Sequence, residues 1–507
     1  MQQSSQSTLS QHPSQGYTSV CPFGFSSKKT SQQSSNAQQF VNQTIHFVAS
    51  ALPSSGAGCE KLPYQLQEEE PKKVPSALCF DHGAYRLHNH DYIRELHEKY
   101  GDIFTIPIEG QDVVFCRHPE VVKRILTSEA EFTKTFADAD SKSTEDVQYF
   151  KNLVQPLLKS AEIFGSGDNS SRRQALKSVF LASGVFHAGF ERVLDRSIPT
   201  WPTGRVDSTA LFHPLVFEMV MVIMAGEDAE ETAPLLVAAQ DCLAHFTSRY
   251  TTPMFDEKIS AEDEKFMKKV EAAAMGITNA FLAKAKQGEL SESCKSSMLG
   301  VIMDCGLTAE EMNSTMVNAL FAACEAPIHV LGATLVELSN RPQLQEQLLS
   351  EIRSVGHEKS PLLQKVLFEG LRLFSPVTLV QRRTITDVVA HGFLIPKDTN
   401  VSVCISAVHQ NEKYFARPTE FDPHRTKLGI VMLNPKQGYM PFSTGPRSCP
   451  GRYLAVTFMK CTLARLVETY VITESANAKT KKLHKFAEFP TDGAYVHFEL
   501  RRPRAKL

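Results

Sequence analysis

Residues 441–451, near the C-terminal end, hold a cysteine in a setting that could activate its sulfur. Three prolines and two glycines in the stretch PFSTGPRSCPG predict a rigid loop, since neither residue favours the interior of a helix or strand. Cys449 lies two residues after Arg447, and a helical spacing of apolar residues begins at Leu454. The guanidinium and the helix N-terminus both favour thiolate over thiol. A rigidly held thiolate is a suitable axial ligand for iron, because nearby N–H groups tune its electron donation.

The same stretch resembles the haem-binding loop of the cytochrome P450 family, Phe-x-x-Gly-x-Arg-x-Cys-x-Gly. Every fixed position matches, namely Phe442, Gly445, Arg447, Cys449 and Gly451. The resemblance implies that these residues bind haem b, with Cys449 as the axial metal ligand and Arg447 neutralising a propionate. The alternative is a buried structural cysteine in a proline-rich turn, which five fixed residue types at fixed spacing disfavour.

A long helix is predicted from Thr308 to Asn340, and Thr308 and Glu311 form a capping box at its start. Its middle resembles the oxygen-binding helix of P450s, whose pattern is Ala/Gly-Gly-x-Asp/Glu-Thr. Glu325 occupies the acidic position, and Ala326 stands where the family has threonine. The resemblance implies that these two positions are catalytic and that protons pass through Glu325 and water.

Pro327 follows directly and has no N–H group, so the carbonyl of Ala323 loses its intrahelical donor. We expect that carbonyl to hold a water molecule, which would partly replace the missing threonine hydroxyl. The alternative from the residues alone is a kinked core helix with Glu325 facing solvent.

Glu369 and Arg372 lie three residues apart on a helix predicted to begin at Ser360. In isolation such a pair is usually a weak surface contact. The spacing resembles the Glu-x-x-Arg motif of P450s, and Arg425 supplies the third member. The resemblance therefore implies a structural ion-pair network beneath the cysteine loop. His409, a lone histidine after a predicted strand, is expected to be structural.

Two further arginines resemble those that contact haem propionates in the family. Arg173 and Phe180 match a helical motif, although Asn169 stands where the family usually has tryptophan. The alternative for Arg173 is a solvated basic turn. Of Arg382 and its neighbour Arg383, the spacing favours Arg382 as the cofactor-binding residue.

Composition limits the classes of partner. The chain has 507 residues, is 42% hydrophobic and 22% charged, and carries a formal net charge of -2, which gives no reason to expect nucleic acid. The eleven cysteines include no Cys-x-x-Cys pair, so their spacing predicts neither a zinc site nor a disulfide framework. The sequence has no dinucleotide glycine fingerprint, so NADPH and flavin are expected on a separate reductase or ferredoxin system.

Three segments are predicted along the chain. Residues 1–59, rich in Ser and Gln, form a disordered tail, residues 60–74 a linker, and residues 75–507 the P450 domain. The longest apolar stretch of the tail is too short to span a bilayer, so no transmembrane anchor is predicted. We expect a soluble monomer in the cytoplasm or an organelle lumen, with a transit peptide as the alternative role for the acid-free tail.

The resemblance covers roughly residues 75–507 and implies a mostly α fold with small β-sheets. In that fold, a triangular prism, the haem lies between the long helix and the cysteine loop. The implied activity is that of an oxidoreductase, a monooxygenase that inserts one oxygen atom from O2 into a small organic substrate such as a secondary metabolite or lipid. Ala326 keeps open a haem-thiolate isomerase, dehydratase or peroxygenase, and a non-catalytic haem-binding protein is the third hypothesis.

Overall fold

The computed structural model describes residues 72–76, 82–108, 111–133, 170–181, 184–226, 232–250, 260–425, 438–474, 482–484, 488–490 and 494–501. By their internal contacts the residues form two units, Met1–Glu69 and Glu70–Leu507, and all described residues belong to the second. The predicted tail, residues 1–59, lies outside the described residues. Lys72–Lys73, at the end of the predicted linker, form strand β1 and pair in parallel with Phe393–Leu394, which makes them part of a sheet.

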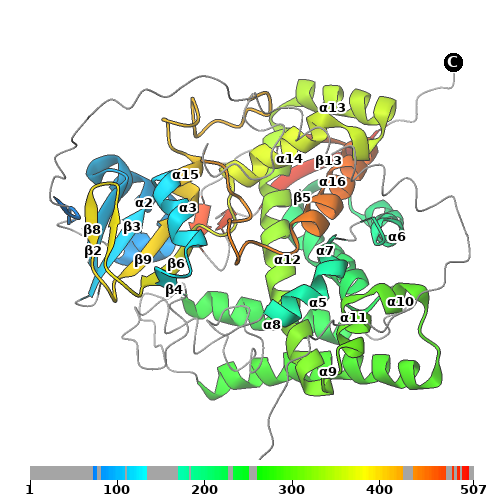
Figure 1. Ribbon diagram of the computed structural model, residues 1–507. Coiled ribbons are helices and arrows are strands. Elements are labelled where there is room, and N and C mark those ends of the chain that lie inside the picture. Colours follow the sequence, from blue (N-terminus) through cyan, green and yellow to red (C-terminus); the bar gives the residue numbers. More distant parts are fainter. Residues whose placement is uncertain are drawn as a thin grey trace, which may run out of the picture. The chain divides into compact units, whose positions relative to one another are not determined.

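Helices make up the larger share of the described residues, as the sequence predicted (Figure 1). They are α2 (His82–Tyr100), α3 (Pro119–Thr127), α5 (Ser170–Leu181), α6 (His187–Ser197), α7 (Ser208–Ala225), α8 (Ala233–Tyr250), α9 (Ala261–Gln287), α10 (Glu292–Ser296), α11 (Met298–Asp304), α12 (Ala309–Ser339), α13 (Pro342–Val355), α14 (Pro361–Leu373), α15 (Ile405–His409) and α16 (Arg452–Thr469), with the 3-10 turns η2 (Ile198–Thr200) and η3 (His357–Lys359).

The strands form small sheets, again as predicted. The largest has the order β2-β3-β9-β6-β4, and the others are β1-β8-β7, β10-β13-β5 and β11-β12. Their bounds are β1 (Lys72–Lys73), β2 (Ile103–Ile108), β3 (Gln111–Cys116), β4 (Phe132–Thr133), β5 (Gly204–Asp207), β6 (Leu379–Thr384), β7 (Val388–Ala390), β8 (Phe393–Ile395), β9 (Asn400–Cys404), β10 (Tyr470–Glu474), β11 (Lys482–His484), β12 (Glu488–Pro490) and β13 (Tyr495–Leu500).

The five-stranded sheet places Arg382. The hairpin expected after Gly101 is present as β2 and β3, and β3 continues in parallel to β9. Strand β6 pairs antiparallel with β9, which sets Arg382 opposite Val401 in the interior of the sheet. Because a strand in the middle of a sheet is held on both edges, this register fixes where the Arg382 side chain leaves the backbone.

Helix α12 is the long helix that the sequence predicted. The Thr308 hydroxyl accepts from the Glu311 N–H and the Glu311 carboxylate accepts from the Thr308 N–H, so the capping box is confirmed. The helix runs as a single element through Pro327 and packs against α7, α9 and α14. Helices α7 and α12 are long and apolar enough to cross a membrane, but 72% and 67% of their apolar windows are buried inside the fold. The apolar residues of α7 and α12 are therefore mostly part of the protein's core.

Helix α14 crosses α12 at a close contact. It begins as predicted, with the Ser360 hydroxyl accepting from the Leu363 N–H and Pro361 at the first helical position. Gly370 lies against the buried Thr334 of α12, where an added Cβ would stand 2.2 Å from the threonine Oγ1. The missing side chain at Gly370 therefore sets the distance between the two helices.

Replacing Gly370 by alanine should lower the free energy of unfolding by about 1–3 kcal/mol, because the new methyl group overpacks against Thr334. The double substitution Gly370→Ala, Thr334→Ala should recover part of this loss, since it removes the obstructing hydroxyl. Gly276→Ala is the matched control: the site is exposed in α9 with nothing within 4 Å, and alanine there should stabilise by about 0.5–1 kcal/mol. Urea denaturation followed by circular dichroism measures all three, and equal effects at 370 and 276 would contradict the packing argument.

Candidate active site

A buried carboxylate lies at the centre of the site's scaffold. Glu369 and Arg372 are both fully buried, and their side chains form a bidentate pair at 2.8 and 2.9 Å. Arg425 joins the same carboxylate, with its Nε 2.9 Å from Oε1 of Glu369. The backbone N–H of Asp422 donates to that oxygen as well, at 3.0 Å. One carboxylate thus binds two guanidinium groups, as the Glu-x-x-Arg resemblance implied.

Main-chain carbonyls satisfy the rest of the two guanidinium groups. Arg372 donates to the carbonyls of His409, Pro418 and Glu420. Arg425 donates to those of Ala416, Arg417 and Glu420. Because each planar guanidinium group donates to several carbonyls at once, these bonds hold the irregular segment 409–425 against α14.

His409 connects this segment to the start of the cysteine loop. It is fully buried, and its Nε2 accepts from the Met440 N–H at 2.9 Å. Since Nε2 accepts, Nδ1 carries the hydrogen and donates to the Ser375 hydroxyl at 2.7 Å. The neighbouring Tyr439 donates to the carbonyl of Phe368 at 2.9 Å, and burial raises the pKa of its hydroxyl well above the usual value. His409 has the structural role expected of it, and it positions the residue directly before the loop.

The cysteine loop is rigid, as its composition predicted. Cys449 donates its N–H to the carbonyl of Phe442 at 2.9 Å, and Ser448 donates to Gly445 at 3.0 Å. Gly445 has φ +79°, and a Cβ there would lie 2.3 Å from the carbonyl oxygen of Leu126 at the end of α3. Only glycine permits this approach. The first helical bond of α16, from Ala455 N–H to the Gly451 carbonyl, follows directly.

Cys449 differs from the other described cysteines in its burial. Of the eight cysteines in the described residues, six are buried, Cys305 is exposed and Cys449 is intermediate. Burial raises the pKa of the Cys116, Cys242 and Cys461 thiols to about 12, which keeps them protonated. Cys449 therefore combines a hydrogen-bonded backbone with partial exposure of the residue.

Two arginines lie close together beside this loop. Arg382 is buried, and burial together with the nearby charge of Arg447 lowers its pKa to about 10. Glu129 stands 3.8 Å from Arg447, but its side chain is 65% exposed and offsets little of the positive charge. An anionic group between the two guanidinium groups would relieve their repulsion.

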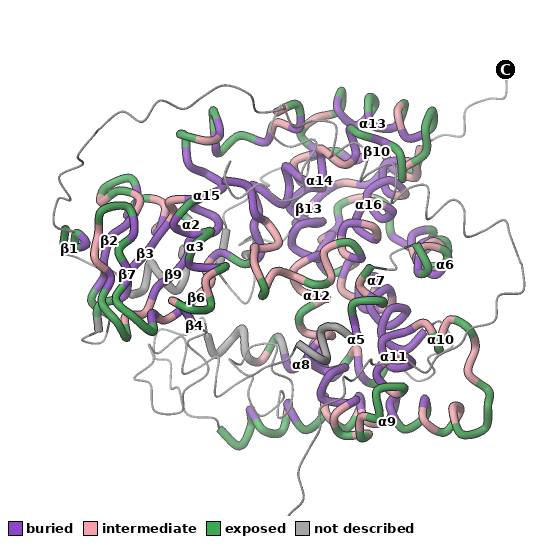
Figure 2. Tube along the Cα trace, in the orientation of Figure 1, coloured by how far each residue is buried: buried purple, intermediate pink, exposed green. Residues whose placement is uncertain are grey.

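The middle of α12 is less buried than the parts of the helix on either side of it. The residues from Met312 to Leu320 and from Pro327 onward are mostly buried, whereas in 321–326 only Cys324 is (Figure 2). The partly exposed or exposed positions there include Ala322, Ala323 and Ala326, which are small. Ala323 and Phe442 both pack against the main core cluster, so α12 and the cysteine loop border one apolar region.

Glu325 does not face solvent, contrary to the alternative interpretation of its helix. Its side chain is 13% exposed and lies between two histidines, with His213 Nε2 3.7 Å from one oxygen and His329 Nε2 3.3 Å from the other. His213, on α7, has its Nδ1 2.7 Å from the carbonyl of Thr209. A carbonyl only accepts, so Nδ1 carries the hydrogen and Nε2, the nitrogen toward Glu325, is basic when the ring is neutral.

Comparison with known proteins decides the family. A family model described as cytochrome P450 matches residues 71–496. The chain belongs to the cytochrome P450 family. Its relatives are P450 monooxygenases, so the chain is a P450-type monooxygenase, an oxidoreductase of a family whose members hold haem through a cysteine thiolate.

Similar proteins come from plants and animals. Abscisic acid 8'-hydroxylase 2 of Oryza sativa subsp. japonica is 26% identical over 405 residues, which cover 74% of this chain and 75% of the relative. Human cytochrome P450 3A5 is 34% identical over 170 residues, covering 32% of this chain and 34% of that protein. Among solved structures, retinoic acid bound cyanobacterial CYP120A1 has a TM-score of 0.69 at 20% identity, over 85% of this chain and 100% of that one. The structural likeness supports the P450 fold.

The residues of this P450 fit a haem. The group is flat and apolar with two carboxylates at one edge, and the small residues in mid-α12 leave room for such a face. Arg382 and Arg447 supply the clustered positive charge that carboxylates would neutralise. Cys449 is partly exposed and lies in the loop with the family's spacing.

The other predicted site residues are placed as follows. Gly451 lies directly before α16, and Ala326 is partly exposed in α12 next to Glu325. Arg173 lies on α5, but its side chain is outside the described residues, and Asn169 is outside them altogether. Sequence reasoning missed His213 and Glu129. Both approach the site from other elements, and nothing in local spacing identifies them.

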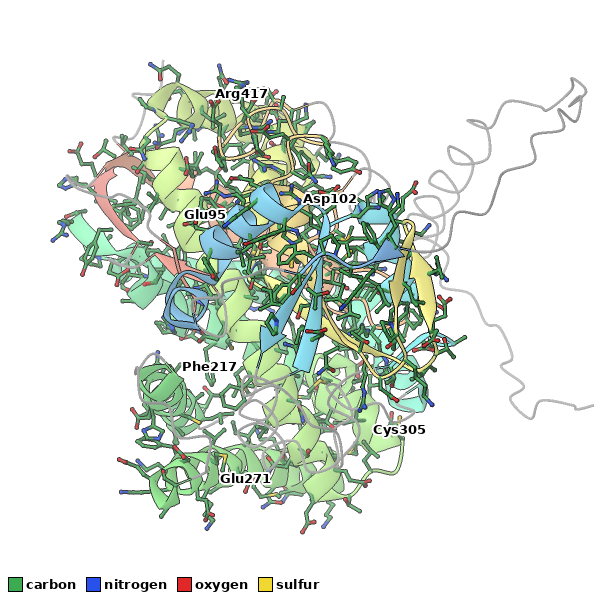
Figure 3. All side chains as sticks on the ribbon, turned by 90° about the vertical axis from the view of Figure 1, so that its left-hand side faces the viewer. Glu95, Asp102, Phe217, Glu271, Cys305 and Arg417 are labelled. Carbon is green, nitrogen blue, oxygen red and sulfur yellow. The ribbon has the colours of Figure 1, made fainter. Side chains whose placement is uncertain are left out.

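Removing the Glu369 carboxylate should cost about 3–5 kcal/mol of folding free energy, because Glu369→Ala leaves two guanidinium groups buried without their anion. We expect little soluble, haem-loaded protein. The control is Arg417→Ala, which removes a 64% exposed partner of Glu420 and Asp422 (Figure 3) and should change stability by less than about 1 kcal/mol. Haem content by absorbance and unfolding by urea provide the measurements. A fully loaded, stable Glu369→Ala protein would show that the network is dispensable.

Proposed function

We propose that this P450 inserts one oxygen atom of dioxygen into a small organic substrate, and that Cys449 is the axial ligand of its haem b. The partly exposed Cys449, held by a backbone hydrogen bond in a loop with the family's spacing, carries this proposal. The most extensive of the reported sequence matches is named as an abscisic acid hydroxylase, which supports a small organic molecule, such as a secondary metabolite or lipid, as substrate. The net reaction consumes O2, two electrons and two protons, and yields the hydroxylated product and water.

When bound, a thiolate-ligated haem supplies the activation of dioxygen. The chain's own residues hold the cysteine loop in place and bind the cofactor's carboxylates. The loop N–H groups and the Phe442 carbonyl hold the backbone of Cys449 in place, so the sulfur needs no rearrangement. Arg382 and Arg447, with Arg173 from α5, would bind the propionates. The Glu369 network keeps the loop's approach segment in position.

Protons would reach the site through Glu325. Because Nδ1–H of His213 is committed to Thr209, its Nε2 can accept a proton from solvent and pass it to the Glu325 carboxylate. His213 is 26% exposed and Glu325 is 13% exposed, so the pair leads from the surface inward. The Ala323 carbonyl, which Pro327 deprives of its helical donor, would hold a water molecule at the next step. This route would supply what the threonine supplies in other members, although Ala326 carries no hydroxyl.

Electrons would come from a separate reductase or ferredoxin, with NADPH and flavin on that partner. We keep a soluble monomer in the cytoplasm or an organelle lumen as the proposed state. The alternative activity is that of an isomerase, dehydratase or peroxygenase, and Ala326 is the observation that favours it, since such enzymes need no proton delivery for the activation of dioxygen.

The ligand assignment predicts a spectroscopic result. Reduced wild-type protein with carbon monoxide should show the Soret band of a thiolate-ligated haem, and Cys449→Ser should lose it. Cys305→Ser, which changes the exposed cysteine in Figure 3, should retain it. Wild-type spectra from Cys449→Ser would rule out Cys449 as the ligand.

The proton route predicts how substitutions affect turnover. Glu325→Gln should slow NADPH-dependent product formation by about 100-fold, as expected for a lost proton donor, and His213→Gln should slow it less, because water can replace a residue nearer the surface. Ala326→Thr should change the coupling of NADPH use to product only modestly. Solvent isotope effects on the substituted enzymes would locate the slowed proton transfer.

Turnover measured with and without reductase and NADPH, with catalase present, distinguishes the monooxygenase from the alternative activities. The monooxygenase requires reductant in every reaction. Product formed at the same rate without NADPH would establish the isomerase or dehydratase instead, and activity restored only when catalase is omitted and peroxide added would establish the peroxygenase.

A further inference from the structure

A second group of metal-ligating side chains lies away from the cysteine loop, where α6 and η3 contact α16; α6 and α16 are labelled in Figure 1. It consists of His187 and Glu191 of α6, His357 of η3 and Cys461 of α16. Their four ligand atoms all lie within 4.8 Å of one another. Cys461 comes nine residues after Arg452, the first residue of α16, which is about 14 Å along the helix axis. The group is therefore separate from the haem-thiolate site.

The separations between its ligand atoms suit four-coordination. Cys461 Sγ is 3.5 Å from His357 Nε2, and His357 Nε2 is 3.6 Å from Glu191 Oε1. His187 Nε2 is 4.0 Å from the same oxygen. A tetrahedral zinc ion with bonds of about 2.0–2.3 Å has ligand atoms roughly 3.3–3.8 Å apart, so small side-chain movements complete the geometry.

The backbone that carries these residues is firmly packed. His187 and Glu191 are four residues apart on one helix, which places them on the same face. Phe190 of α6 packs edge to face against Phe458 of α16, with ring centroids 6.0 Å apart. Both phenylalanines are buried, so the two helices meet directly beside the group.

One carboxylate oxygen is already oriented by a neighbour. Arg465, one turn beyond Cys461, binds Oε2 of Glu191 at 2.5 Å and also pairs with Asp195. This leaves Oε1 directed at the histidines. Outer contacts of this kind are typical of metal ligands. Glu358 is the competing group, since its carboxylate lies 3.0 Å from His187 Nε2, but its side chain is 67% exposed and can turn away into solvent.

We propose that His187, Glu191, His357 and Cys461 form a binding site for a divalent zinc ion. Two imidazoles, one carboxylate and one thiolate are ligands that zinc accepts; the metal displaces the proton of the Cys461 thiol, which is released to solvent, and the two anionic ligands then match the charge of the ion. Because all four ligands come from the protein, the site is structural and links α6 and η3 to the helix that follows the cysteine loop. The cysteine spacing alone could not predict it, since the ligands come from three elements far apart in the chain.

The test uses the full-length, haem-loaded protein after treatment with a chelator. Zinc is titrated in competition with a fluorescent chelator, and bound metal is measured by mass spectrometry after gel filtration. We expect one zinc ion per chain in the wild type. His357→Gln and Cys461→Ser should each weaken binding by about 100-fold, as expected when one of four ligands is lost. His357 lies partly exposed on a short turn, so its substitution should leave folding and the carbon monoxide spectrum intact.

The matched controls are His497→Gln, from an exposed His–Glu pair without a cysteine, and Cys305→Ser, and both should bind zinc like the wild type. Cadmium provides a second readout: its charge-transfer band with thiolate should appear in the wild type and in Cys305→Ser but not in Cys461→Ser. A wild type that binds no zinc would overturn the proposal. So would binding that is equally tight in His357→Gln and Cys461→Ser, since the metal would then be elsewhere.

Discussion

The scaffold of the site depends on the carboxylate of Glu369, which balances the buried positive charges of Arg372 and Arg425. The carboxylate faces two guanidinium groups, and removing two arginines from water is expensive unless every donor finds an acceptor. The main-chain carbonyls of the 409–425 segment provide those acceptors, so the irregular segment is held by charge-assisted bonds rather than by regular secondary structure. His409, at the start of this segment, accepts a hydrogen bond from the N–H of Met440 and so positions the residue directly before the cysteine loop. The position of Cys449 thus follows from an ion pair on a different element.

The long helix α12 combines tightly packed ends with less buried middle turns. Most of α12 is buried and packs tightly, as the close approach of Gly370 to Thr334 shows, yet its middle turns must stay open toward the cofactor. Small residues at 322, 323 and 326 meet this demand without a gap in the helix. Glu325, in the same turns, is directed toward the histidines of α7 and α12. A core helix here combines close packing with a carboxylate that lies between two histidines.

The sequence predicted what depends on local spacing. The cysteine loop, the capping box at Thr308, the start of α14 and the hairpin all follow from residue types within a few positions of one another, and the structure has each of them. The partners of Glu325 and Arg447 could not be predicted in this way. His213 and Glu129 reach the site through tertiary packing of α7 and of the segment after α3, and a single histidine or glutamate carries no local pattern. The same holds for Cys461, whose neighbours come from α6 and η3.

The sheet β10-β13-β5 has a consequence for synthesis of the chain on the ribosome. Strand β5 pairs with β13, and Ser208, at the start of α7, binds the carbonyl of Ala494, 286 residues later. At about 5–20 residues per second, roughly 15–60 s pass between the translation of these two partners. Helix α12, which packs on the apolar α7, is translated well before β13, so α7 lacks both partners only during the first part of that time. We therefore expect the nascent chain to expose the apolar face of α7 until α12 has been translated, and to leave the edge of β5 unpaired until β13 follows.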